Sequence, residues 1–97
     1  MAFVYLLRCG DGTLYCGWTT DLGARVAAHD AGRGARYTRG RGPVALAAAW
    51  EAADRSAAQA LEVRVKRLTR ADKEALVAGA QLAGAARVAV GGSDAPG

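Results

Sequence analysis

The 97-residue chain is poor in the residues that build metal clusters and disulfide frameworks. It has two cysteines, Cys9 and Cys16, a single histidine, His29, and no asparagine. Two cysteines without a Cys-x-x-Cys spacing exclude a cysteine-based zinc site, and one histidine excludes a multi-histidine metal site. Two isolated cysteines also fit a reducing compartment better than a disulfide framework, so we predict a cytoplasmic protein.

Long hydrophobic runs are missing as well. The chain begins directly with a strand-like run, without a leader and without a long apolar stretch. We therefore expect neither a signal peptide nor a membrane-spanning helix, and no membrane partner. The length suffices for one modest core. We place a single domain at residues 1–79, followed by an alanine- and glycine-rich tail at residues 80–97 that we predict to be disordered.

Positive charge is in excess and unevenly distributed. The net charge is +4, and residues 33–41 hold four arginines and one tyrosine but no acidic residue. A local basic patch with an aromatic side chain is typical of a surface that contacts phosphates and stacks on a base. An exposed loop without a ligand is the alternative interpretation of this segment. The predicted nucleic-acid-binding residues are Arg33, Arg36, Tyr37, Arg39 and Arg41, with Lys66 from a later helix.

Apolar runs and turn residues predict the order strand, strand, helix, strand, helix, helix. Residues 3–8 and 14–18 form a hairpin around an Asp-Gly pair, residues 22–31 form a helix, and residues 44–51 form a third strand. A second helix is predicted at residues 57–68, capped by Asp54 or Ser56, and a third ends near residue 78. Thr20 or Asp21 is the predicted cap of the first helix. We therefore expect an α+β fold with a three-stranded antiparallel sheet flanked by helices.

The register of the hairpin decides where its two tyrosines lie. A two-residue turn would pair Cys9 with Leu14 and put Tyr5 and Tyr15 on opposite faces of the sheet. A three-residue loop with a glycine bulge would pair Cys9 with Tyr15 and put both phenol rings on one face. The second geometry is required if both tyrosines act in one site.

Several short motifs stand at defined spacings between residues 3 and 78. They are Phe3-Val4-Tyr5, Tyr15-Cys16-Gly17 with Arg25 and His29 after it, and Leu61-Glu62 with Lys66, Leu68, Lys73 and Leu76 after it. Together they resemble the GIY-YIG nuclease family, and in particular its small stand-alone bacterial members. The first triplet keeps only the tyrosine of the family pattern, and a cysteine replaces isoleucine in the second. The combination is specific, whereas either tyrosine triplet alone is a weak signal.

The resemblance implies a metal-dependent endonuclease that hydrolyses phosphodiester bonds of DNA, in repair or recombination. It implies catalytic roles for Tyr5, Tyr15, Arg25 and His29, and it implies that Glu62 holds the metal cofactor, Mg²⁺ or Mn²⁺. We favour Tyr5 as the general base and Tyr15 as the residue that positions phosphate or water, with the reverse assignment open. A tyrosine acts as a base only if its pKa falls well below about 10, and nearby positive charge lowers it.

Spacing alone leaves simpler interpretations open. Arg25 and His29 lie four residues apart on one helix face, which is either a phosphate clamp or a solvated surface. Glu62 and Lys66 stand in the favourable order for an i, i+4 salt bridge, which is the alternative to a metal ligand. For the whole chain, the alternatives are a non-catalytic nucleic-acid-binding module with this fold and an adaptor that docks on a repair protein. RNA also remains open as a substrate.

Overall fold

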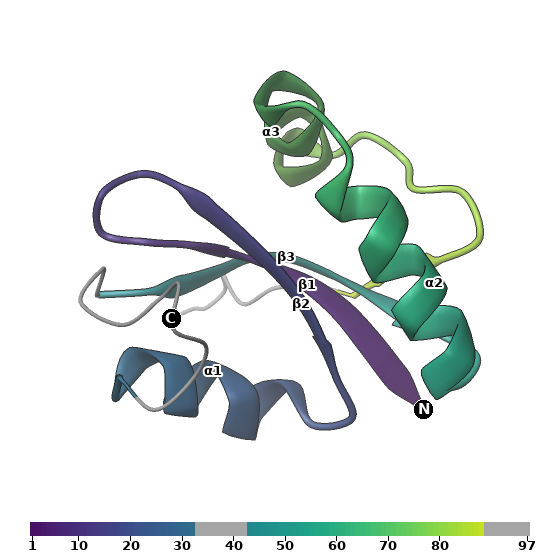
Figure 1. Ribbon diagram of the computed structural model, residues 1–97, viewed down its shortest axis with the longest axis horizontal. Coiled ribbons are helices and arrows are strands. Elements are labelled where there is room, and N and C mark those ends of the chain that lie inside the picture. Colours follow the sequence, from purple (N-terminus) through teal and green to yellow (C-terminus); the bar gives the residue numbers. More distant parts are fainter. Residues whose placement is uncertain (33–42, 89–97) are drawn as a thin grey trace.

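The computed structural model describes residues 1–32 and 43–88, and within them four strands form one antiparallel sheet with helices on both faces (Figure 1). The strands are β1 (Ala2–Arg8), β2 (Leu14–Thr19), β3 (Ala45–Ala52) and β4 (Ala86–Val88). The helices are α1 (Leu22–Asp30), α2 (Arg55–Lys66) and α3 (Arg70–Ala78). The spatial order of the strands in the sheet is β2-β1-β3-β4, so β2 is an edge strand.

The predicted element order is confirmed, but the described part of the sheet has one strand more than predicted. β4 pairs with β3 in antiparallel fashion at residues 86–88. β4 lies inside the segment 80–97 for which we predicted a disordered tail, and residues 89–97 of that segment lie outside the described part. Sequence reasoning missed β4 because three residues in an alanine- and glycine-rich stretch carry no recognisable strand periodicity.

Each of the three helices begins at a side-chain cap that the sequence supplies locally. Asp21 caps α1 by accepting from the amide of Ala24 at 3.0 Å, and Asp54 caps α2 by accepting from the amide of Ala57 at 2.8 Å. Thr69 caps α3 in the same way. These caps fix the first turn of each helix and therefore the direction in which its later side chains point. The longest helix has 12 residues, and none in the described part is long and apolar enough to cross a membrane.

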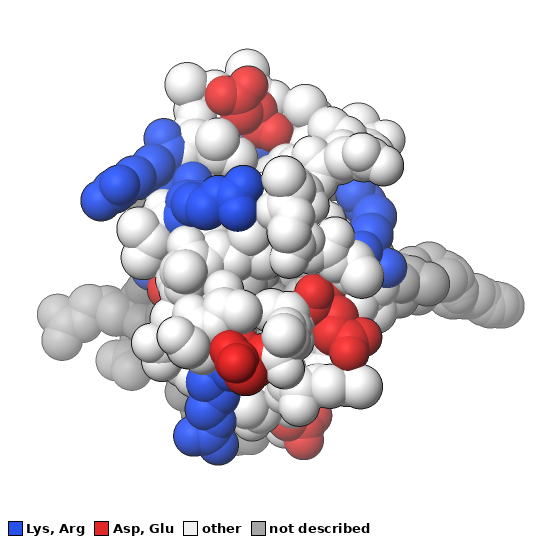
Figure 2. All heavy atoms as spheres, turned by 90° about the vertical axis from the view of Figure 1, so that its right-hand side faces the viewer, with Lys and Arg blue, Asp and Glu red and all other residues white. Residues whose placement is uncertain are grey.

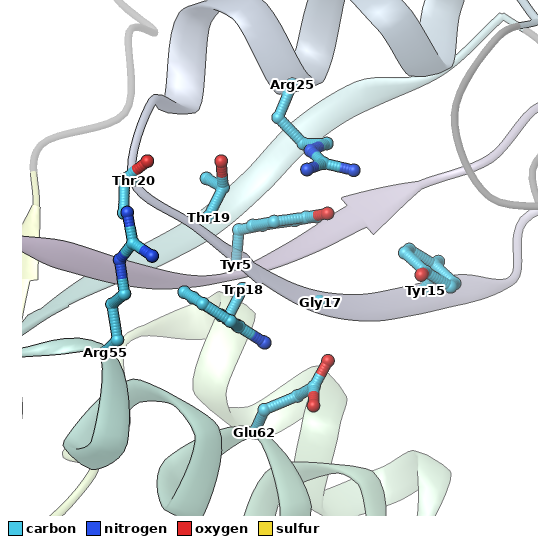
Figure 3. A pocket seen from close by; sticks show the side chains of 9 residues that line it. All are labelled: Tyr5, Tyr15, Gly17, Trp18, Thr19, Thr20, Arg25, Arg55 and Glu62. Carbon is cyan, nitrogen blue, oxygen red and sulfur yellow. The ribbon is translucent and has the colours of Figure 1, made fainter.

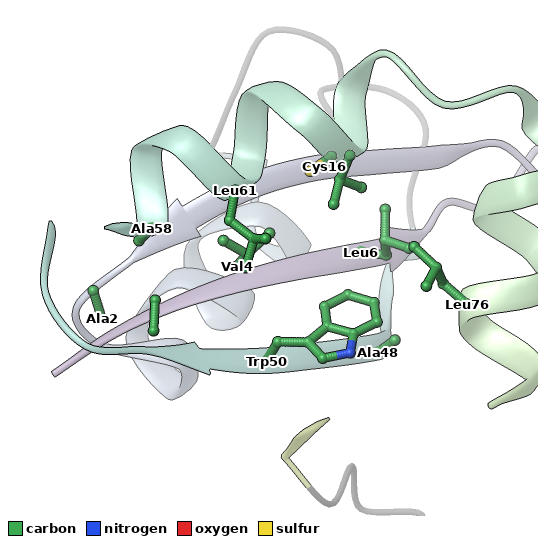
Figure 4. Close-up of a cluster of buried hydrophobic side chains, with 11 residues drawn as sticks. Ala2, Val4, Leu6, Cys16, Ala48, Trp50, Ala58, Leu61 and Leu76 are labelled. Carbon is green, nitrogen blue, oxygen red and sulfur yellow. The ribbon is translucent and has the colours of Figure 1, made fainter. Parts of the chain in front are cut away.

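Alternation along β1 divides the core between the two faces of the sheet. On the face covered by α2 and α3, the large buried side chains are Val4, Leu6, Trp50, Leu61, Val65 and Leu76 (Figure 4). On the face covered by α1, the buried group is smaller and consists of Tyr5, Leu7 and Ala49 with partly buried neighbours. Burial of one large apolar side chain contributes about 1.5–3 kcal/mol, so the first face supplies most of the stability.

Candidate active site

The β1–β2 hairpin sets the positions of the two tyrosines. Its three-residue loop ends at Gly12, which has a φ of 88° and donates from its amide to the carbonyl of Cys9 at 2.9 Å. Glycine adopts this left-handed conformation without strain, so the loop is the predicted glycine-bulge type. Cys9 lies opposite Thr13 instead of Tyr15, which makes the predicted partner wrong by two residues. Because the observed register differs from the predicted one by an even number of residues, Tyr5 and Tyr15 still share one face of the sheet.

Gly17 lies opposite Tyr5 in the strand register, and the Tyr5 ring covers it. A Cβ atom at position 17 would meet Cζ of Tyr5 at 2.7 Å and would lie still closer to the hydroxyl oxygen. The glycine of the second triplet is therefore required by the close approach of this ring. The motif contained this glycine, but its role depends on a ring from the neighbouring strand, which the sequence does not display.

His29 reaches from α1 to both tyrosines. Its Nε2 atom lies 3.1 Å from the hydroxyl oxygen of Tyr5, and its ring centroid lies 5.2 Å from that of Tyr15. The side chain is 2% exposed and is the one buried residue of α1. Burial, aided by the charge of Arg25, lowers the pKa of His29 and favours the neutral imidazole. We assign the Tyr5 hydroxyl as the donor and the unprotonated Nε2 as the acceptor.

Burial raises the pKa of both tyrosines. For Tyr5, loss of hydration is the largest cause, Tyr15 adds to it and Arg25 opposes it. For Tyr15, loss of hydration again comes first and Lys66 opposes it. A tyrosine that acts as a base was expected to have a pKa well below its usual value. The positive charges of the described residues do not lower the pKa of either tyrosine that far. The positive groups act in the expected direction, but withdrawal from water outweighs them.

A cavity of about 380 Å³ brings the candidate residues together at the β2 edge of the sheet. Figure 3 shows Arg25 entering from α1 and Glu62 from α2, with Tyr5 and Tyr15 between them. Within the described residues, β2 has no strand partner on its outer side, so side chains from both faces of the sheet meet around it. Four predicted residues from four separate elements thus share one cavity. His29 lies behind them, in contact with the tyrosines.

Glu62 forms the i, i+4 ion pair that the sequence offered as one interpretation, and it also lines the cavity. Its Oε2 atom lies 3.4 Å from Nζ of Lys66. Among the described residues that line the cavity, Glu62 is the only carboxylate, and no cluster of three or more potential metal-ligating side chains occurs in residues 1–32 and 43–88. A single carboxylate suits Mg²⁺, which accepts few protein ligands and retains its waters. Lys66 is 51% exposed and stands beside the cavity.

Sequence reasoning missed part of the cavity lining. Arg55, the first residue of α2, lies beside Thr20 and faces the same cavity (Figure 3). Its spacing of seven residues from Glu62 was the available signal, because residues two turns apart share one helix face. Trp18 and Thr19 complete this side of the lining. The predicted basic loop lies outside the described residues, and with it Arg33, Arg36, Tyr37, Arg39 and Arg41.

The comparison with protein families decides the assignment of the chain. The family described as the GIY-YIG catalytic domain matches residues 1–75. The chain belongs to the GIY-YIG family. The match spans β1, β2, α1, β3, α2 and part of α3, and so includes every element that lines the cavity.

Relatives of this GIY-YIG protein occur in bacteria and archaea. It is 54% identical over 78 residues to a UPF0213 protein of Vibrio cholerae, covering 79% of this chain and 77% of the relative. A UPF0213 protein of Halobacterium salinarum is 53% identical over 76 residues, which cover 78% of this chain and 99% of the relative. The solution NMR structure of a UPF0213 protein from Bacillus halodurans matches with a TM-score of 0.52 at 47% identity, covering 80% of this chain and 84% of that chain. The resemblance noted from the sequence and the α+β fold are thereby confirmed.

Proposed function

We propose that this protein is a metal-dependent endonuclease that hydrolyses phosphodiester bonds of DNA. The main support is the convergence of Tyr5, Tyr15, Arg25 and Glu62 in one cavity, within a chain that belongs to a family of catalytic domains. Phosphodiester hydrolysis needs an activated water, positive charge on the phosphoryl oxygens and stabilisation of the departing oxygen. The cavity contains a chemical group suited to each of these tasks.

Two guanidinium groups are suited to bind phosphate in the cavity. Arg25 comes from α1 and Arg55 from α2. A guanidinium is permanently charged, and its planar fork matches phosphate oxygens. The charge of Arg25 acts on Tyr5, Tyr15 and His29, so we assign this residue to the scissile phosphate. Arg55 is not among the described charges that act on either tyrosine, and we assign it to a flanking phosphate.

We assign Glu62 to hold the divalent cation, Mg²⁺ or Mn²⁺. Its carboxylate lies in the cavity opposite Arg25 (Figure 3), and water and phosphate oxygens would complete the ligand set. When bound, such a cation supplies positive charge to the phosphoryl and leaving oxygens and lowers the pKa of a bound water. Lys66 neutralises part of the Glu62 charge at 3.4 Å and is available to contact the nucleic acid.

Tyr5 and His29 are suited to take the proton of the attacking water. In our assignment the Tyr5 hydroxyl donates to Nε2 of His29 at 3.1 Å, so the phenol oxygen can accept from a water in the cavity. As the water oxygen bonds to phosphorus and the bond to the leaving oxygen breaks, one proton moves from water to Tyr5 and another from Tyr5 to His29. This relay needs no free phenolate, whose formation is opposed by burial. The lowered pKa of His29 keeps it neutral and ready to accept.

A cleavage assay with a matched pair of acidic variants tests this function. Wild-type protein, Glu62→Gln and Asp72→Asn are incubated with supercoiled plasmid and with branched oligonucleotides, in Mg²⁺, Mn²⁺ or EDTA. Asp72 is exposed on α3 and does not line the cavity, so its variant controls for loss of one negative charge. We expect cleavage that requires metal, persists in Asp72→Asn and falls at least about 100-fold in Glu62→Gln.

Other outcomes separate the alternative functions. Equal cleavage by wild type and Glu62→Gln would reveal a contaminating nuclease and contradict the proposal. Absence of cleavage together with salt-sensitive DNA binding in all three proteins would favour the non-catalytic binding module. Absence of both activities would favour the adaptor. Parallel branched RNA substrates decide whether DNA is the preferred nucleic acid.

A further inference from the structure

A second, smaller hollow lies along the same edge of the sheet. It has a volume of about 170 Å³ and is lined by Thr13, Leu14, Arg70 and Lys73. Thr13 and Leu14 lead into β2, whereas the candidate active site is lined by residues from position 15 to position 20 of the same segment. The two hollows therefore follow one another along one strand. We call the smaller one the hairpin hollow.

Lys73, on α3, belongs to the hairpin hollow. Its charge acts on the thiol of Cys16 in the middle of β2. The charges of Glu62 and Lys66, which belong to or border the active-site cavity, act on the same thiol. Within residues 1–32 and 43–88, the Lys73 ammonium forms no ion pair or hydrogen bond. It is therefore available to an anion from outside the protein.

Arg70 is held in place beside this ammonium. Its Nη2 atom donates to the carbonyl of Gly12 at 3.0 Å and lies 3.5 Å from a carboxylate oxygen of Glu74. Arg8 binds both oxygens of the same carboxylate, and this interaction is the main cause of the lowered pKa of Glu74. Arg8 already matches the negative charge of Glu74. A second described carboxylate beside the hollow is that of Asp11, which accepts from the hydroxyl of Thr13 at 2.6 Å, and the two positive charges of Arg70 and Lys73 exceed its single negative charge.

The face that Figure 2 presents has no continuous basic track among its described residues. On the face that Figure 2 presents, the described Lys and Arg side chains form separate patches, interrupted by acidic and uncharged residues. At the β2 edge, by contrast, cationic groups line two successive hollows, with Arg25 and Arg55 in one and Arg70 and Lys73 in the other. A polyanion that lies along β2 meets both pairs.

We propose that the hairpin hollow binds a backbone phosphate of the same DNA strand whose scissile phosphate lies in the active-site cavity. This inference rests on the proposed function and adds the direction of the bound strand, from the active site toward the β1–β2 turn. The hollows are three to four residues apart along β2, which corresponds to roughly 10–13 Å at about 3.3 Å per residue. The rise is about 3.4 Å per nucleotide, and successive phosphates of one strand are farther apart than this rise because the backbone winds around the axis, so the second phosphate lies about two to four nucleotides from the scissile one.

DNA binding in EDTA tests this subsite independently of cleavage. Lys73→Gln removes the ammonium, Lys73→Arg keeps the charge, and Arg67→Gln removes an exposed charge that lines neither hollow. The affinity of each protein for a fluorescent branched DNA is measured at several salt concentrations. For Lys73→Gln we expect a salt slope smaller by about 0.9 and an affinity about five- to tenfold lower near 0.1 M salt, with little change in the other two variants.

A scan with neutral phosphate analogues locates the contact. One methylphosphonate placed at a position about two to four nucleotides from the cleavage position should weaken binding of the wild type but not of Lys73→Gln. Equal salt slopes for Lys73→Gln and Arg67→Gln would overturn the subsite while leaving the nuclease proposal intact. Absence of salt-dependent DNA binding by the wild type would overturn both.

Discussion

The two faces of the sheet bury different kinds of side chain. On one face, α2 and α3 bury only apolar residues, namely Ala58, Leu61, Val65 and Leu76. On the other face, α1 buries a single residue, and it is His29. The buried side chains of α2 and α3 make apolar contacts, whereas the buried side chain of α1 makes a polar contact with a tyrosine. The difference teaches that the larger apolar core and the tyrosine–histidine part of the candidate site lie on opposite sides of β1, whereas Glu62 and Arg55 reach the cavity from α2.

The energetic reasons for burial also differ between the faces. Apolar burial is favourable in itself. A buried phenol and imidazole lose hydration, and the hydrogen bond between Tyr5 and His29 offsets that loss. Replacement of a site residue should therefore change chemistry more than folding, and replacement of a core residue should do the opposite.

The largest effect is expected from Tyr5→Phe. This variant keeps the ring over Gly17 but removes the hydroxyl that accepts the proton of the attacking water. We expect the single-turnover cleavage rate to fall by about 10²–10⁴-fold, as for loss of a general base. The fold should persist, with a loss of about 1–3 kcal/mol in the free energy of unfolding because His29 loses a partner.

Tyr15→Phe is the matched variant. If Tyr15 only positions phosphate or water, its loss should reduce the rate less than the loss of Tyr5. A Tyr5→Phe protein that cleaves at the wild-type rate would refute the relay through His29. A larger effect at Tyr15 would reverse the assignment of the two tyrosines.

The next effect is a loss of stability, expected from Leu76→Ala on the face covered by α2 and α3. In free energy it is similar to or smaller than the effect of Tyr5→Phe on the cleavage rate. Leu76 is 4% exposed and packs in the main core, away from the cavity. Truncation should lower the free energy of unfolding by about 2–5 kcal/mol. Val26→Ala, at a half-buried position on α1, should cost only about 1 kcal/mol. Urea denaturation measures both values, and equal losses would mean that the faces contribute equally to stability.

The smallest effect is expected from titration of His29. Its pKa is lower in the folded protein than the ordinary value of 6.5, so the unfolded chain takes up the proton first as the pH falls. The stabilising contribution is therefore present above pH 6.5 and is lost as the pH falls toward the folded pKa, by at most about 1.4 kcal/mol per pH unit. Urea midpoints across this window measure the loss.

His29→Gln is the control for this titration. Its unfolding free energy should lack the decline just below pH 6.5, because this histidine is the only one in the chain. Cleavage by the wild type should fall over the same window, since a protonated Nε2 no longer accepts from Tyr5. An identical pH profile in both proteins would assign the titration to other groups.

Local signals account for the parts of the fold that could be predicted. The caps at Asp21, Asp54 and Thr69 and the helices that follow them depend on residues within one turn of each other. The glycine-bulge loop was one of the two hairpin geometries that the sequence predicted, because the signal for a turn also comes from neighbouring residues. The partner of Cys9 was wrong because Gly12, with its positive φ, is the last residue of the three-residue loop, so the loop covers residues 10–12 and lies one position earlier than the predicted pairing requires. β4 was missed because its pairing with β3 spans more than thirty residues of sequence.

By itself, the sequence determined the order of the elements up to α3, the family and the candidate residues Tyr5, Tyr15, Arg25 and Glu62. Only the tertiary structure decided that these four side chains meet around an edge strand, that Tyr5 pairs with His29, and that Arg55 faces the same cavity. It also decided the direction in which the tyrosine pKa values move. The physical reason is that spacing determines which side chains share a helix or strand face, whereas loss of water and contacts between distant segments arise only when those faces pack.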